Sequence, residues 1–92
     1  MTGVCQLSIR LFEINSLKEK RSIVKSLIQK LMHKYNISIA EVGYNDKLDV
    51  ALIEFAAVSN NVRLVNEIID KVIEFIEFSY EVEIYNIERE VV

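Results

Sequence analysis

Four cations near the start of one helical segment are the residues of this sequence best suited to chemistry. Residues 16–25 read SLKEKRSIVK and place Lys18, Lys20, Arg21 and Lys25 close together. A helix start also offers free backbone N–H groups and the positive end of the helix dipole, and both attract anions. We therefore treat these four residues as a candidate contact for phosphate or nucleic acid.

The same cations have a second interpretation, in which acidic residues of the chain neutralise them. Six of the eleven Lys and Arg residues lie between positions 18 and 34, whereas eight of the fourteen Asp and Glu residues lie between 67 and 90. A second helix in that acidic region would lie beside the first, and Glu13, Asp46 and Asp49 are expected at the same end of the fold as the cations. The net charge of −3 also disfavours general binding to polyanions, so only the local cluster supports an RNA contact. The sequence leaves both interpretations open.

Residue patterns for catalysis and for metal binding are missing. His33 is the only histidine and has no adjacent acid pair, and Cys5 is the only cysteine, so neither belongs to a metal-ligand cluster. The chain has two glycines and therefore no glycine-rich phosphate loop. We expect no enzymatic activity, no metal and no cofactor. The single cysteine favours a reduced, cytoplasmic setting, and no apolar run is long enough for a membrane span.

Hydrophobic periodicity predicts six elements in the order β-α-β-β-α-β. Alternation indicates strands, three- and four-residue spacing indicates helices, and YNDK at 44–47 has the composition of a turn. The predicted strands are 4–12, 37–44, 48–59 and 81–92, and the predicted helices are 17–35 and a second one capped by residues 59–61. The phase of strand 37–44 is irregular, which indicates either a bulge or a strand that is exposed to water on neither face.

This order predicts one α+β domain over residues 1–92, with the ferredoxin-like βαββαβ topology. Right-handed crossovers then give a four-stranded antiparallel sheet in the order 4-1-3-2, with two helices on one face. The start of the first helix and the turn at 44–47 share one end of this fold. Lys18, Lys20 and Arg21 are therefore expected near Lys47 and Tyr44.

The third strand is apolar on both of its faces. Phe55 shares one face with Ile53 and Ala57, and the other face carries Val50, Leu52, Ala56 and Val58, interrupted only by Glu54. The central strands lack the spaced aromatic residues with which RNA-recognition modules stack bases. The pattern favours a homodimer formed through the sheet over an uncovered apolar face.

Several segments together resemble the YlxP-like family, a bacterial domain of unknown function. They are SLKEKRSIVKSL, YNISIAEV, the turn with Asp46 and a helix that closes before EVEI. The resemblance implies a small ferredoxin-like domain. It also implies a role near RNA or the ribosome, because members tend to be encoded beside translation and ribosome-assembly factors. Relatives carry a tryptophan and a basic residue after the aspartate, where this chain has Leu48 and Val50, so base stacking by the hairpin is not expected.

The resemblance carries over to the basic set Lys18, Lys20, Arg21 and Lys25. The sequence thus favours a small, non-enzymatic binding module that contacts ribosomal or other structured RNA through the basic start of its first helix. The alternative is a dimeric structural or regulatory protein-interaction domain without a nucleic-acid role.

Overall fold

Six regular elements follow one another along the chain, which the computed structural model describes over residues 1–92. The strands are β1 (Thr2–Leu11), β2 (Ile37–Gly43), β3 (Val50–Val58) and β4 (Val82–Val91), and the helices are α1 (Leu17–Lys34) and α2 (Val62–Ser79). The predicted order of elements is confirmed, and each predicted range overlaps the observed element.

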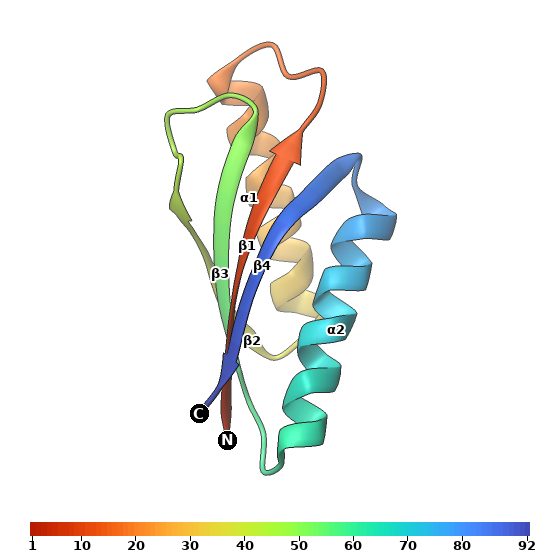
Figure 1. Ribbon diagram of the computed structural model, residues 1–92. Coiled ribbons are helices and arrows are strands. Elements are labelled where there is room, and N and C mark those ends of the chain that lie inside the picture. Colours follow the sequence, from red (N-terminus) through yellow and green to blue (C-terminus); the bar gives the residue numbers. More distant parts are fainter.

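The four strands form one antiparallel sheet in the order β2-β3-β1-β4. The two helices lie together on one face of this sheet, and the opposite face has no helix over it (Figure 1). The predicted ferredoxin-like α+β topology is therefore confirmed. Neither helix combines the length and the apolar composition that crossing a bilayer requires.

The core lies between the sheet and the helices, because alternate residues of the two central strands point to that side. These strand residues are Cys5, Leu7, Ile9, Leu11, Ala51, Ile53, Phe55 and Ala57, and the helices contribute Val24, Leu27, Leu31, Val65, Ile69, Val72 and Ile76. Gly3 allows α2 to approach β1 closely, since a Cβ atom there would lie 2.3 Å from Cγ1 of Val65. The predicted placement of Phe55 with Ile53 and Ala57 is confirmed.

β2 contains a bulge, as predicted, but the bulge does not explain the irregular phase, because burial alternates regularly along β2 and Ala40 and Val42 lie on the exposed side. The pairing of β2 with β3 shifts register between Glu41 and Gly43, as a bulge does. Before the shift, Ile37, Ile39 and Glu41 are partly buried and alternate with exposed residues. A carboxylate therefore follows two isoleucines on the side of the sheet that faces α1.

One end of the molecule brings three separate segments together. The start of α1, the β2–β3 connection and the end of α2 all lie at this end, opposite to the two termini (Figure 1). The connection contains the predicted turn, in which the Lys47 N–H donates to the Tyr44 carbonyl at 3.0 Å. Tyr44 has a positive φ of 60°, a strained left-handed conformation for a residue other than glycine.

Candidate functional site

The start of α1 carries its own cap. Oγ of Ser16 accepts a hydrogen bond from the Glu19 N–H at 3.1 Å, and Oε2 of Glu19 accepts one from the Asn15 N–H at 3.3 Å. This reciprocal pair is the capping box that the spacing of Ser16 and Glu19 indicates. A carboxylate of the chain therefore already lies at the positive end of the helix dipole, and any phosphate contact has to come mainly from the cations.

We predict that Ser16→Ala lowers the free energy of unfolding by about 1 kcal/mol, because the Glu19 N–H loses its acceptor. Urea denaturation followed by circular dichroism measures this. Ser22→Ala is the matched control, since Ser22 is an exposed residue within α1, six positions after Ser16. Equal midpoints for Ser16→Ala and Ser22→Ala would contradict the prediction.

Lys20 differs from the other three cations because its side chain is fully buried. Its Nζ atom donates a hydrogen bond to the Tyr44 carbonyl at 2.5 Å and lies 3.2 Å from Oε2 of Glu41. That Oε2 atom is buried and has no hydrogen-bond partner, so the nearby ammonium group is its only compensation. Lys20 thus joins α1 to the end of β2 and to the turn of the hairpin.

The burial of Lys20 corrects the predicted phosphate-binding set. The Lys20 side chain has no exposed surface. An RNA phosphate stays outside the packed protein and cannot reach it. The sequence does contain a signal for this position. The buried stripe Val24, Leu27 and Leu31 continues back by one helical turn to residue 20.

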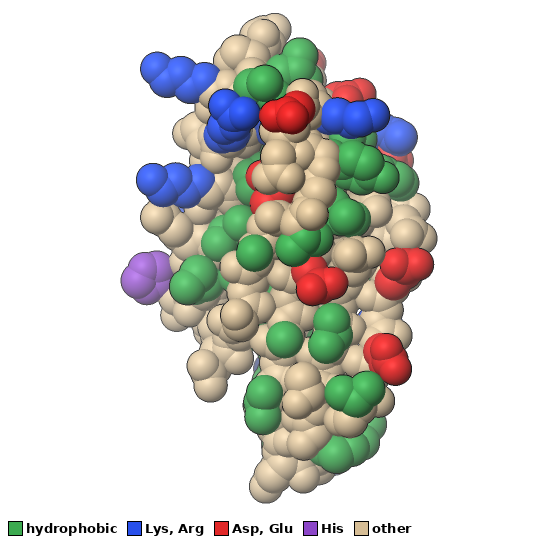
Figure 2. Space-filling model, turned by 90° about the vertical axis from the view of Figure 1, so that its left-hand side faces the viewer, with side chains coloured by type: hydrophobic (Ala, Val, Ile, Leu, Met, Phe, Trp, Pro, Cys, Tyr) green, Lys and Arg blue, Asp and Glu red, His purple; other side chains and the backbone are tan.

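Lys18, Arg21 and Lys25 form an exposed strip on one flank of α1, here called the α1 ridge. Lys18 and Lys25 make no ion pair, and Nη2 of Arg21 lies 3.9 Å from Oδ1 of Asp46. The Arg21 and Asp46 side chains are 60% and 95% exposed, so solvent screens their attraction and the guanidinium remains accessible. Figure 2 shows Lys and Arg side chains gathered at the end of the molecule that holds the start of α1 and the β2–β3 connection.

Acidic residues of α2 do not neutralise the α1 ridge. The only charged partners of α2 acids are Arg89, which pairs with Asp70 at 2.7 Å, and Arg63, which lies 3.8 Å from Glu67. The contacts between the helices instead involve aromatic rings. Nζ of Lys30 lies 5.6 Å from the ring centre of Tyr80, and Nζ of Lys34 lies 4.9 Å from that of Phe75. The helix-to-helix part of the neutralisation hypothesis is therefore wrong.

A shallow hollow lies beside the α1 ridge, between α1 and the edge strand β2. Its volume is about 320 Å³, and its lining includes Arg21, Lys25, Ile28 and Gln29 from α1. Glu41 lines it from β2. Two cations of the ridge thus border a groove that a ligand can enter from solvent.

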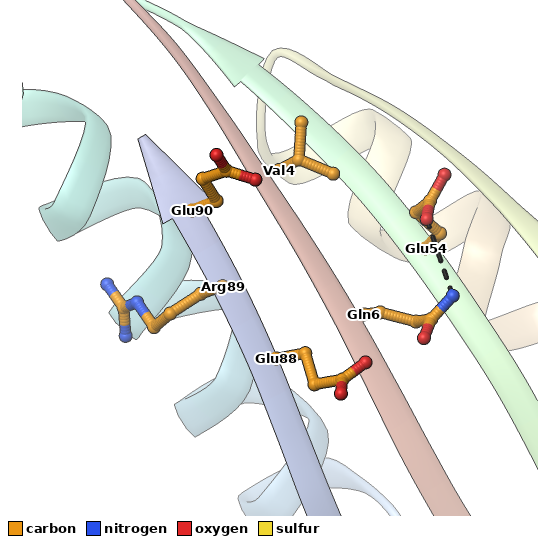
Figure 3. Close-up of a pocket in the computed structure, with 6 residues that line it drawn as sticks. All are labelled: Val4, Gln6, Glu54, Glu88, Arg89 and Glu90. Carbon is orange, nitrogen blue, oxygen red and sulfur yellow. Dashed lines mark hydrogen bonds between the residues drawn. The ribbon is translucent and has the colours of Figure 1, made fainter. Parts of the chain in front are cut away.

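The open face of the sheet has the opposite charge. A hollow of about 330 Å³ on this face is bordered by Glu54, Glu88 and Glu90, around Val4 and Gln6 (Figure 3). The Gln6 amide donates to Glu54 at 3.4 Å, and the Arg89 side chain points away to α2. Three carboxylates on this face, one from β3 and two from the edge strand β4, repel a phosphate backbone. RNA contact through the open face is therefore unfavourable.

Two further residues that the sequence singles out lie apart from the α1 ridge. His33 is exposed in the last turn of α1. Cys5 is completely buried, and this burial raises the pKa of its thiol to about 11, although the nearby Arg89 guanidinium partly opposes the rise. No group of three or more His, Cys, Asp or Glu side chains is placed to hold a metal ion.

Comparison with known proteins gives one family and one curated relative. Residues 2–89 match the family described as "Protein of unknown function (DUF503)". The chain is also 31% identical over 83 residues to a Bacillus subtilis protein described as "Uncharacterized protein YlxP". That alignment covers 90% of each chain, so the similarity extends over nearly the whole domain.

Proposed function

Because this chain belongs to the DUF503 family, which includes YlxP-like proteins, we propose a function from its own surface: a non-enzymatic module that contacts structured RNA, such as ribosomal RNA, through the α1 ridge. The observation that carries the proposal is the placement of Lys18, Arg21 and Lys25. These three cations are exposed on one flank of one helix, and two of them have no acidic partner. The fully buried thiol of Cys5 suits a reduced cytoplasmic setting, where RNA is found.

Charge and shape both favour this flank over the rest of the surface. The ridge lies next to the β2–β3 turn, where Nζ of Lys47 lies 5.7 Å from the centre of the Tyr44 ring. The Lys20 hydrogen bond to Tyr44 holds that turn against the start of α1. Lys47 of the hairpin is thus kept close to the ridge as a fourth cation. Contacts between such cations and phosphates fix the position of a protein on a nucleic acid.

We predict that Lys18→Glu together with Arg21→Glu weakens binding to a ribosomal RNA fragment roughly tenfold or more in low salt, across different sequences. Loss of two phosphate contacts also makes the salt dependence shallower by roughly one unit of slope for each contact. Fluorescence anisotropy titrations at several salt concentrations measure both quantities. Stability should be unchanged or slightly raised, because two cations leave the positive end of the helix dipole.

A matched control separates a local contact from the effect of net charge. Arg10→Glu together with Arg63→Glu changes the net charge by the same amount on other elements, β1 and the first turn of α2. Wild-type binding curves for the ridge variant would refute the RNA proposal. Equal weakening by the ridge variant and by the control would refute the assignment to the ridge.

The alternative function is that of a dimeric structural or regulatory domain without a nucleic-acid role. One observation favours it: Val50, Leu52, Ala56 and Val58 form a row on the open face of β3 that only Glu54 interrupts, and Val58 is 68% exposed. A second copy would remove this row from water. The carboxylate of Glu54 within this row and that of Glu88 on β4 oppose such a contact, which is why we rank it second.

For this alternative we predict that Leu52→Lys converts a dimer into a monomer, because a charged side chain would be buried in the contact between the sheets. Light scattering coupled to size exclusion measures the mass of both proteins. Gln29→Lys, which adds the same charge on an exposed part of α1, should leave the mass unchanged. A wild-type protein that is monomeric at high concentration would exclude the dimer.

A further inference from the structure

Phe78 has no structural role that accounts for its position. Its side chain lies in the last turn of α2 and is 90% exposed, which is the largest exposure among the bulky apolar residues of the chain. The residues with which α2 contributes to the core are Val65, Ile69, Val72 and Ile76. An aromatic ring left in water on a helix surface is typical of a contact site rather than of a core.

A hollow of about 320 Å³ adjoins this ring, between the end of α1 and the second half of α2. We call it the helix seam, and its lining residues are Lys34, Tyr35, Lys71, Glu74, Phe75, Phe78 and Ser79. The hydroxyl of Tyr35 donates to the Lys71 carbonyl at 3.4 Å, so the two helices are joined at this point. The helix seam therefore has one wall from each helix.

The lining of the helix seam contains two lysines and three aromatic rings. Nζ of Lys34 lies over the Phe75 ring, at 4.9 Å from its centre, and neither Lys34 nor Lys71 forms an ion pair. Glu74 is the one carboxylate in the lining, so the cations outnumber the acids. The ring of Phe78 is the aromatic surface that remains free. A ligand that fits these groups has a flat π face together with negative charge.

We propose that the helix seam binds an unpaired nucleotide of RNA, with its base stacked on Phe78 and its phosphates next to Lys34 and Lys71. This inference rests on the proposed RNA function but uses a different surface, since the α1 ridge lies on the other flank of α1. Stacking on an aromatic ring tolerates any base, because every base has a π face. Bases inside a duplex are not accessible in this way, so the ligand is single-stranded or looped RNA.

The test uses a fluorescein-labelled eight-nucleotide oligoadenylate and a twelve-base-pair RNA duplex as probes. Phe78→Ala and Phe78→Leu should each weaken binding to the oligoadenylate roughly five- to hundredfold, the range expected for the loss of one stacked base. Phe78→Leu is the decisive control, because it keeps an apolar side chain and removes the π face. All variants should share the wild-type denaturation midpoint, since the residue is exposed.

Phe78→Trp provides a direct readout, because the natural chain contains no tryptophan. The single indole should retain binding and lose fluorescence when the oligoadenylate is added, and the duplex should leave its fluorescence unchanged. Wild-type affinity in Phe78→Leu, an unquenched indole, or an equal response to the duplex would each overturn the inference. So would unchanged oligoadenylate binding in Phe78→Ala, which would leave the ring as a protein contact.

The two RNA surfaces can fail separately. If the charge reversals at Lys18 and Arg21 have no effect while Phe78→Ala weakens binding, the α1 ridge is wrong and the helix seam stands. If the reversals weaken binding and the Phe78 variants do not, the helix seam is wrong and the α1 ridge stands. Absence of any RNA binding by the wild-type protein overturns both.

Discussion

Lys20→Met is expected to lower the free energy of unfolding by roughly 3–5 kcal/mol, the cost of leaving one charge of a buried pair without its partner. Methionine keeps most of the length and apolar volume of the lysine stem, so the loss reports the charge rather than a cavity. The carboxylate of Glu41 would keep its burial and lose its ammonium, and the Tyr44 carbonyl would lose a donor. Urea denaturation of both proteins at pH 7 measures the difference.

Two controls make this prediction specific to the buried pair. Lys25→Met removes a cation from the exposed ridge of the same helix and should change stability by no more than about 0.5 kcal/mol. Lys20→Met combined with Glu41→Leu removes both charges, and such replacements of buried ion pairs are often neutral or stabilising. Full stability of Lys20→Met alone, with Glu41 still present, would contradict the assigned role.

The second large effect concerns the reactivity of Cys5. At pH 8 the thiol of the folded protein should react with iodoacetamide at least about a hundredfold more slowly than that of the unfolded chain, because the reactive species is the thiolate. The factor follows from the pKa, which rises from the ordinary value of 9.0 to about 11 on folding. Burial is the main cause, and it also blocks access of the reagent. Rates in buffer and in denaturant, followed by mass spectrometry, give the comparison.

The same pKa predicts how stability depends on alkaline pH. Well below pH 9 the thiol is protonated in both the folded and the unfolded protein, so it does not change the free energy of unfolding. Between pH 9 and 11 the thiol ionises in the unfolded chain but not in the folded one. The free energy of unfolding therefore falls over this range, by roughly 3 kcal/mol in total once the pH exceeds 11. Cys5→Ala lacks this ionisation, so its stability should fall less over this range. Parallel stability curves for Cys5→Ala and the wild type would contradict the prediction.

Local patterns in the sequence determined the elements of this protein. The alternation of Cys5, Leu7 and Ile9 sets the buried face of β1, and the spacing of Val24, Leu27 and Leu31 sets that of α1. Ser16 and Asn61 cap the two helices through hydrogen bonds that reach only three residues along the chain. Such features depend on near neighbours, which is why they are readable before any tertiary structure is known.

The topology could also be predicted from the sequence, because few topologies are possible for six elements joined by short connections and right-handed crossovers. The strand order and the shared end of α1 and the hairpin follow from that restriction. They predicted that Lys20 and Arg21 lie near the turn, and the contacts to Tyr44 and Asp46 confirm it. The stripe of Val24, Leu27 and Leu31 points back to position 20 as the inward one, but the pattern did not show that an ammonium group would be fully buried there.

Only the tertiary structure decided the environment of each charged or aromatic side chain. Lys20 is inside because Glu41 and the Tyr44 carbonyl meet it from distant parts of the chain, and their combined electrostatic interaction offsets the cost of removing an ammonium group from water. Phe78 carries the same apolar character as Phe55, yet one ring is exposed and the other is buried. Residue type supplies the chemistry, but exposure and partners are properties of the packed fold.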